Sequence, residues 1–218
     1  MSTVVLHDKK FKICMTAAQI DNAVAKVAEK INTDLKDVDV PIFLSILNGS
    51  FMFTADLMRK IEVKSDVVFV KLASYQGTES TGEVKQIVGL TKGVEGKTVV
   101  VVEDIVETGN TIEEIHKILK DAGAANIKIC TLLYKPDAYK KDIPIHYAAL
   151  QIPNDFIVGY GLDYNQLGRQ YKDIYVLDES GESTQHKQNN KKLNINHEIL
   201  SSVRPPRCRK GDPGQTYG

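Results

Sequence analysis

The strongest structural signal in this sequence is Val99-Val-Val-Val-Glu103-Asp104-Ile-Val-Glu107-Thr108-Gly109-Asn110-Thr111. Four successive valines behind a threonine are typical of a central β-strand, because β-branched side chains fit the pleated surface of a sheet. Beyond the quoted residues, apolar side chains recur at helical spacing as far as Gly123, which is a common type of helix terminator. The stretch therefore predicts a strand, a short polar turn and a helix that is capped by Thr111–Glu114.

Strands and helices alternate through much of the chain. Thr16-Ala-Ala-Gln19 is a capping-box pattern that opens an amphipathic helix. Pro41–Leu47 is an apolar run typical of a strand buried on both faces, and Ser50 can cap a short helix that runs to Arg59. Further strands are expected at residues 67–72, 127–133, 146–151, 156–159 and 174–177. This alternation predicts an α/β domain around a mostly parallel sheet.

The last part of the chain has a different character. A chain of 218 residues is long enough for one sizeable core, which we expect to occupy residues 1–180. Residues 181–218 contain seven apolar side chains in 38 positions, without periodicity. Such a segment cannot bury enough surface to offset its ordering entropy. We therefore predict one folded domain, 1–180, and a disordered tail, 181–218.

Composition excludes several classes of protein. The net charge is zero, and residues 181–218 hold seven Lys/Arg and three Asp/Glu, which leaves residues 1–180 acidic. An acidic domain offers no surface for specific nucleic-acid binding. No apolar run approaches the roughly 20 residues of a membrane helix, and residues 1–12 lack a secretory apolar stretch. The three cysteines are scattered without a CxxC motif, so we expect a reduced, cytoplasmic protein.

The turn after the valine strand has the composition of an anion site. Thr108–Thr111 would present successive backbone N–H groups and two hydroxyls at a helix N-terminus, and Gly109 lets the backbone approach a phosphate closely. Glu103 and Asp104 would repel that phosphate unless they held sugar hydroxyls or a hard cation such as Mg²⁺. A ribose 5-phosphate satisfies both halves of the pattern. The alternative is an ordinary strand–turn–helix connection with a solvated acidic turn.

The same stretch resembles the phosphoribosyl-pyrophosphate signature of type I phosphoribosyltransferases: an apolar run, two acids, two apolar residues, an acid, then Thr-Gly-x-Thr. Further segments resemble the hypoxanthine-guanine branch of that family, so that the resemblance covers about residues 10–178. It implies a central sheet with a small hood. It also implies magnesium-dependent transfer of a phosphoribosyl group from phosphoribosyl pyrophosphate to a 6-oxopurine, and a homo-oligomer, either a dimer or a tetramer.

Two segments resemble the pyrophosphate-binding parts of the family. Leu47–Phe53 resembles the first loop, in which Asn48 and Gly49 would hold pyrophosphate next to a cis peptide bond. The family commonly has Lys at position 48, so Asn48 removes one cation from the site. The alternative for Asn48-Gly49 is a type I′ hairpin turn. Arg169 resembles the pyrophosphate-binding arginine, and the alternative is a solvated surface residue.

Ser74-Tyr75 and the polar residues up to Lys85 resemble the mobile lid of the family. A lid protects an oxocarbenium-like ribose from water. Taken alone, residues 74–86 read simply as a long polar loop.

Four residues resemble the purine-binding set. A lysine at position 135 would meet the 6-oxygen of the purine and reject adenine, whose 6-amino group is a donor. Phe156 would stack on the purine, the backbone of Ile157 would read its edge, and Asp163 would lie near its 2-position and a second magnesium ion. The alternatives are a surface lysine, a core phenylalanine and an aspartate in a turn.

Glu107 occupies the position of the family's proton-handling carboxylate, where the hypoxanthine branch usually has Asp. The extra methylene adds about 1.5 Å of reach, and misplacements of that size can cost much rate. We nevertheless predict Glu107 as the general base or acid. Asn110 stands where Lys is frequent, and its backbone would serve the phosphate. Rival interpretations are a xanthine-using relative and a non-catalytic regulator that senses phosphoribosyl pyrophosphate.

Residues 203–214 of the tail permit an unusual reading. Shifted by one nucleotide, their codons allow a string that resembles the nucleotide-binding loop of adenylate kinase, and the residues from Lys192 to Ile195 resemble those just before that loop. This hypothesis makes residues 192–214 a frameshifted remnant of a fused kinase, without kinase activity. A random extension or linker is the alternative.

Overall fold

The computed structural model describes residues 3–75, 84–88 and 93–179. Backbone contacts divide the chain into two units, Met1–Leu177 and Asp178–Gly218. Only Asp178 and Glu179 of the second unit are among the described residues, so the fold below is that of the first unit. The predicted tail, 181–218, and the segment 192–214 within it lie outside the described residues.

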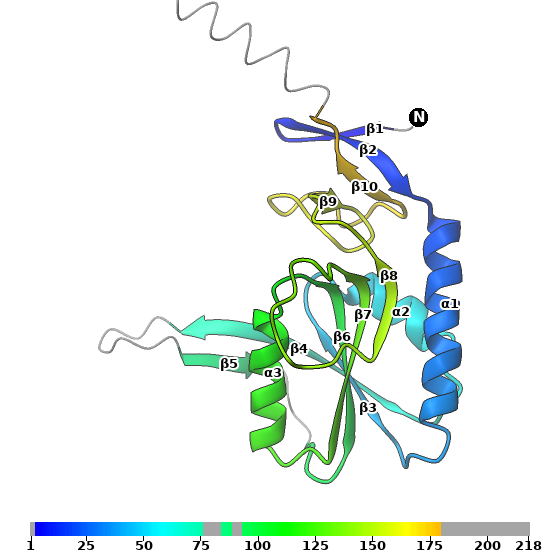
Figure 1. Ribbon diagram of the computed structural model, residues 1–218, viewed down its shortest axis with the longest axis vertical. Helices are drawn as coiled ribbons and strands as arrows, with labels where there is room; N and C mark the ends of the chain where they lie inside the picture. Colours follow the sequence, from blue (N-terminus) through cyan, green and yellow to red (C-terminus); the bar gives the residue numbers. More distant parts are fainter. Residues whose placement is uncertain (1–2, 76–83, 89–92, 180–218) are drawn as a thin grey trace, which may run out of the picture. The chain divides into compact units, whose positions relative to one another are not determined.

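A six-stranded sheet with the order β5-β4-β3-β6-β7-β8 forms the body of the first unit (Figure 1). All neighbouring strands are parallel except β4 and β5, which pair antiparallel. This is the mostly parallel α/β sheet expected from the sequence. The strands are β3 (Ile42–Ile46), β4 (Asp66–Tyr75), β5 (Val84–Val88), β6 (Thr98–Val106), β7 (Asn126–Tyr134) and β8 (Tyr147–Gln151).

The valine run lies at the centre of this sheet, as predicted. Strand β6 pairs with β3 on one side and β7 on the other, and Val99–Val102 are completely buried. Because side chains alternate along a strand, Val100 and Val102 join one core cluster while Val99 and Val101 join the other. Burial on both faces explains why the segment reads as a continuous apolar run.

Three helices cover the two faces of the sheet: α1 (Ala17–Asp34), α2 (Phe51–Met58) and α3 (Asn110–Asp121). Helices α1 and α2 pack with the cluster that contains Val100, and α3 packs with the cluster that contains Val99. The predicted capping box at Thr16 is present, with both reciprocal hydrogen bonds. Gly123 follows the end of α3 with a φ of +80°, as a helix terminator should.

The two other predicted caps have different outcomes. Ser50 is the N-cap residue of α2, as predicted, but its hydroxyl makes no capping hydrogen bond, because it donates to the carbonyl of Ile46 and lies 2.8 Å from the hydroxyl of Ser45. Helix α3 begins at Asn110 with Gly109 as its N-cap, so Thr111 lies inside the first turn. In neither case does a hydroxyl side chain cap the helix.

A second sheet forms the small hood that the family resemblance implies (Figure 1). Its order is β1-β2-β10-β9, and every pair is antiparallel. The strands are β1 (Thr3–Leu6), β2 (Lys9–Met15), β9 (Ile157–Val158) and β10 (Ile174–Leu177). Strands β1 and β2 were not predicted. The alternation of Phe11, Ile13 and Met15 with polar residues could have indicated β2.

The predicted polar loop at residues 74–86 is partly strand. Strand β4 continues to Tyr75, and β5 returns antiparallel to it with Tyr75 opposite Val84. Residues 76–83 and 89–92 lie outside the described residues. Among the described residues, no helix combines the length and hydropathy needed to cross a bilayer.

Candidate active site

The bend between β6 and α3 forms a pocket. It is lined by Glu103 and by every residue from Ile105 to Ile112, which includes all four predicted phosphate-binding residues, Thr108–Thr111. Gly109 has a φ of +85° and is the N-cap of α3, and its carbonyl accepts the backbone N–H of Glu113 at 2.9 Å. The pocket therefore opens at a helix N-terminus, where backbone N–H groups favour an anion.

Gly109 is required by its neighbours as well as by its φ angle. A Cβ at this position would lie 2.5 Å from the ring of Tyr139 and 2.8 Å from Cγ of Lys141. Both belong to the segment after β7. The hydroxyl of Tyr139 donates to the carbonyl of Ile143 at 2.6 Å, and Lys141 pairs with Glu113 at 2.6 Å. The side chains of Tyr139 and Lys141 therefore pack against the α-carbon of Gly109 and support the turn. The sequence did not predict this contact.

The acidic pair at the end of β6 has an unusual environment. Oε2 of Glu103 is buried and has no hydrogen-bond partner among the described residues. Burial, with the charge of Asp104, raises the pKa of Glu103 well above its usual value. Burial also raises the pKa of Asp104, although its hydrogen bonds and Arg169 oppose the shift. The described residues contain no cluster of three or more potential metal ligands, so these two carboxyls would serve a cation largely by themselves.

The predicted pyrophosphate loop lies against this pair. The peptide bond between Leu47 and Asn48 is cis, as the resemblance implies. A Cβ on Gly49 would lie only 1.6 Å from Oδ2 of Asp104, so only glycine fits there. The alternative of a hairpin turn is wrong, because β3 and β4 are parallel and α2 intervenes. The side chain of Asn48 is exposed.

Lys135 lies beside the bend, in contact with Glu107. It follows β7, its side chain is only 5% exposed, and its ammonium group binds Oε1 of Glu107 and the carbonyl of Asp155, the latter at 2.8 Å. A plain surface lysine is therefore excluded. The carboxylate of Glu107 and the ammonium of Lys135 stand together at the rim of the phosphate pocket.

Phe156 is 43% exposed, which excludes a fully buried core residue. Its ring is supported by Phe11 of β2 at 5.8 Å and by Tyr164 at 5.5 Å between centroids. Ile157 next to it is buried, and its backbone is paired with Val176 in β10. The hood therefore holds an aromatic ring in place while leaving much of it accessible to a ligand.

Asp163 and Arg169 form an ion pair of 2.6 Å. The second oxygen of Asp163 accepts the backbone N–H of Gln166 at 2.7 Å, which is the turn contact that the simpler interpretation predicts. Nη1 of Arg169 donates to the carbonyl of Gly161 at 2.7 Å, so Arg169 is not a solvated surface residue. Burial raises the pKa of Asp104, and the charge of Arg169 opposes that rise, as expected for a cation near the acidic pair.

The lid residues are only partly placed. The backbones of Ser74 and Tyr75 end strand β4, opposite Lys85 and Val84. Their side chains, and the rest of the predicted lid at residues 76–83, lie outside what the structure describes.

Comparisons with known proteins identify the family of this chain. A phosphoribosyl transferase domain matches residues 16–165. The chain therefore belongs to the phosphoribosyltransferase family and is an enzyme.

The most similar relatives carry a more specific name. The hypoxanthine-guanine phosphoribosyltransferase of Staphylococcus epidermidis is 38% identical over 173 residues, covering 79% of this chain and 96% of that protein. A crystal structure of a hypoxanthine phosphoribosyltransferase from Staphylococcus aureus aligns with a TM-score of 0.69 and 36% identity, covering 77% of this chain and 91% of that one. The hypoxanthine phosphoribosyltransferase of Trypanosoma cruzi aligns with a TM-score of 0.68 and 32% identity, covering 76% and 95%.

Proposed function

We propose that this chain transfers the 5-phosphoribosyl group of phosphoribosyl pyrophosphate to hypoxanthine or guanine, giving IMP or GMP and pyrophosphate. One observation carries the proposal: a buried lysine, Lys135, meets Glu107 at the rim of a pocket that opens on a helix N-terminus. A cation that can read a 6-oxopurine and a carboxylate that can take its proton thus stand beside an anion site. The names of the similar proteins point to the same reaction.

The phosphate of the sugar fits the turn. The backbone N–H groups of Thr108–Thr111 and the two threonine hydroxyls would bind the 5-phosphate. Asn48, Gly49 and Arg169 would bind the pyrophosphate on the other side of the acidic pair. Charge that develops on the leaving group would then meet preorganised donors, which is usually the largest source of rate enhancement.

The acidic pair fits Mg²⁺ together with the ribose hydroxyls. Two buried carboxyls with raised pKa values, one bearing an unpartnered oxygen, are what a hard cation would stabilise. Mg²⁺ usually takes one or two carboxylates plus substrate oxygens, so a pair of carboxyls with no third potential ligand clustered beside it in the described part of the chain is a suitable donor set. When bound, the ion would neutralise negative charge on the pyrophosphate. Asp163 would reach a second ion only by giving up its pair with Arg169.

Glu107 is the proposed proton acceptor. The purine would stack on Phe156 with its 6-oxygen at Lys135, while Ile157 and Asp163 would face its other edge. In that position, as one imidazole nitrogen attacks the ribose, the proton on the other, N7, would pass to a nearby carboxylate. The ion pair of Lys135 and Glu107 keeps both groups at the same edge of the pocket. The purine would then take over the Lys135 contact and release Glu107 for proton transfer.

A substrate panel tests this function. The full chain is mixed with phosphoribosyl pyrophosphate and Mg²⁺, and release of pyrophosphate is followed with hypoxanthine, guanine, xanthine or adenine. We expect turnover with hypoxanthine or guanine and none with adenine. Turnover with xanthine alone would favour the xanthine-using alternative. Binding of phosphoribosyl pyrophosphate without any turnover would favour a non-catalytic regulator. Lys135 and Phe156 argue against a regulator, because they form a purine-binding set that such a protein does not need.

The remaining expectations belong to the same proposal. They are a cytoplasmic location and assembly into a dimer or a tetramer.

A further inference from the structure

Tyr160 has an unusual backbone conformation. Its φ angle is +49°, and it stands between Gly159 at +100° and Gly161 at +97°. Glycine adopts such angles freely, but a bulky aromatic residue does so only where its surroundings hold it. No contact of the proposed mechanism explains why a tyrosine occupies this place.

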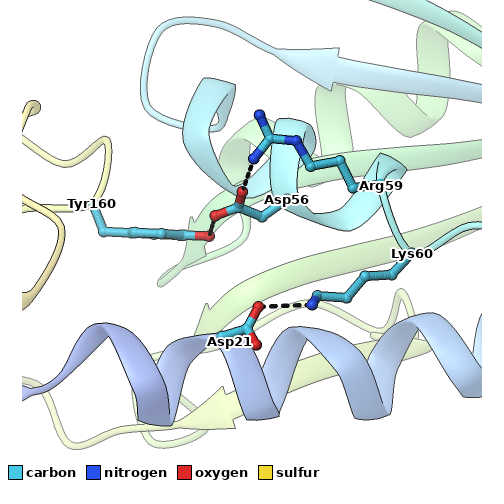
Figure 2. Close-up of polar contacts among 5 residues, drawn as sticks. All are labelled: Asp21, Asp56, Arg59, Lys60 and Tyr160. Atoms are coloured by element: carbon cyan, nitrogen blue, oxygen red, sulfur yellow. Dashed lines mark hydrogen bonds and ion pairs between the residues drawn. The ribbon is translucent and has the colours of Figure 1, made fainter.

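The side chain of Tyr160 reaches away from the hood into the core. It is only 4% exposed, and its hydroxyl donates to Oδ2 of Asp56 on α2 at 2.6 Å (Figure 2). Oδ1 of the same carboxylate accepts from Nη1 of Arg59 at 3.0 Å. Burial and the bond to Asp56 raise the pKa of Tyr160, so the hydroxyl keeps its proton and remains a donor.

Helix α2 is continuous with the pyrophosphate loop. It begins one residue after Ser50, whose hydroxyl is bound to the end of β3. At its other end, Lys60 pairs with Asp21 of α1 at 2.7 Å (Figure 2). Asp56 is therefore held at a defined position relative to Asn48 and Gly49. A residue that is hydrogen-bonded to Asp56 is positioned relative to the same loop.

The residue after Tyr160 touches that loop directly. A Cβ on Gly161 would lie 2.0 Å from the carbonyl oxygen of Gly49, so the two backbones are in close contact. The carbonyl of Gly161 also accepts the bond from Arg169. Gly161 thus joins the pyrophosphate loop to the arginine that is proposed to bind the same ligand.

We propose that the hydrogen bond between Tyr160 and Asp56 is a positioning contact that holds Gly161 and Arg169 against the pyrophosphate loop. The inference rests on the proposed function and deepens it, because it predicts which substrate depends on this contact. Phosphoribosyl pyrophosphate would be bound less well without it. The purine contacts at Lys135 and Phe156 would be little affected, because these two side chains are held by other partners.

The chain contains a matched control. Tyr147 is also buried, and its hydroxyl also donates to a helical carboxylate, Asp34 of α1, at 3.0 Å. It lies on β8 and contacts none of the proposed site residues in any interaction described above. A general loss of stability from removing a buried hydroxyl should therefore occur in both Tyr160→Phe and Tyr147→Phe.

Steady-state kinetics provide the first test. In Tyr160→Phe, KM for phosphoribosyl pyrophosphate should rise roughly fivefold to tenfold, while KM for hypoxanthine and kcat should change less than about twofold. Asp56→Ala should do the same, with no additional effect in the double variant. Arg59→Ala removes only the hydrogen bond between Arg59 and Asp56, so this variant should leave both KM values unchanged, as should Tyr147→Phe. An unchanged KM in Tyr160→Phe, or an equal rise in Tyr147→Phe, overturns the proposal.

Amide hydrogen exchange provides a test that does not depend on activity. The amides of residues 159–162 and those of Phe51 and Thr54 are hydrogen-bonded in the structure. In Tyr160→Phe both groups should exchange faster than in the unmodified chain, and in Tyr147→Phe they should not. If the unmodified chain shows no transfer reaction, the proposed function fails. The role of the Tyr160–Asp56 hydrogen bond is then tested by amide hydrogen exchange alone. Unchanged exchange at residues 159–162 rejects it.

Discussion

The two walls of the candidate site are built in different ways. The phosphate wall is one continuous segment, Glu103–Thr111, carried by the end of β6 and the start of α3. The opposite wall is assembled from segments far apart in the sequence, namely the loop at Asn48, the lysine after β7 and the hood residues from Phe156 to Arg169. A continuous wall depends on local backbone geometry, whereas an assembled wall depends on the contacts that bring its parts together.

The largest effect is expected where the two walls meet. Glu107 belongs to the phosphate segment but is bound to Lys135 of the other wall. Glu107→Gln should lower kcat about 100-fold or more, with little change in either KM, because proton transfer is lost while the binding groups remain. Steady-state kinetics with hypoxanthine would measure this.

Glu107→Asp is the matched control for that variant, because it keeps the carboxylate and restores the residue usual in this branch of the family. It should retain activity. A kcat in Glu107→Gln within about threefold of the unmodified chain would remove Glu107 from the mechanism.

The next effect concerns the phosphate wall alone. Gly109→Ala places a Cβ 2.5 Å from the ring of Tyr139 at a φ of +85°, so the turn must shift. KM for phosphoribosyl pyrophosphate should rise about 30-fold, because the N–H groups no longer converge on one phosphate. Gly123→Ala is the control, since it has a similar φ but its Cβ would come no closer than 3.2 Å to another atom, Cγ of Glu95. Equal kinetic effects in both variants would contradict a phosphate role for the turn.

A smaller effect is expected on the purine side. Lys135→Met removes the cation that would read the 6-oxygen, so KM for hypoxanthine should rise about tenfold while KM for phosphoribosyl pyrophosphate stays nearly constant. Lys141→Met removes another lysine–glutamate ion pair, with Glu113, and should leave the purine KM unchanged. If Lys135→Met instead raises only the KM for phosphoribosyl pyrophosphate, the division of the site into two walls is incorrect.

The smallest effect is on stability. Glu103→Gln removes a carboxyl whose pKa burial has raised, and so relieves the unfavourable placement of two acids side by side. Without divalent metal, the free energy of unfolding should increase by about 1 kcal/mol, which corresponds to a few degrees in the thermal midpoint. Calorimetry would measure it. A lower midpoint in Glu103→Gln would mean that the carboxyl stabilises the fold and is not held there for a ligand.

Prediction from sequence succeeded where the determining interactions are local. The valine strand, the capping box at Thr16 and the end of α3 at Gly123 depend on residues within a few positions of each other. Strands β1 and β2 were missed because their short, lysine-rich alternation is stable only when β10, from the other end of the domain, pairs with β2. Ser50 is the N-cap of α2 as assigned, but its hydroxyl binds the carbonyl of Ile46 at the end of β3 in place of the helix. The cap assigned to Thr111 was wrong, because Gly109 is the N-cap of α3.

The site shows the same division. Its residues could be named from motifs, but the burial of Lys135, its bond to Glu107 and the contact of Gly161 with Gly49 could not. The support from Tyr139 and the bond of Tyr160 to Asp56 were missed as well, since nothing near either tyrosine indicates its partner. The frameshift hypothesis for residues 192–214 stays a prediction without support from the comparisons, and the nucleotide sequence would test it.

The amino-acid sequence by itself determined the α/β class, the central strand and the composition of the anion turn, because alternation, helical spacing and glycine placement act over a few residues. Tertiary structure alone decided which charges are buried, which side chains face each other and how the hood meets the pyrophosphate loop. The physical reason is that burial and electrostatic pairing depend on distances between segments that are more than a hundred residues apart in some cases, such as Tyr160 and Asp56.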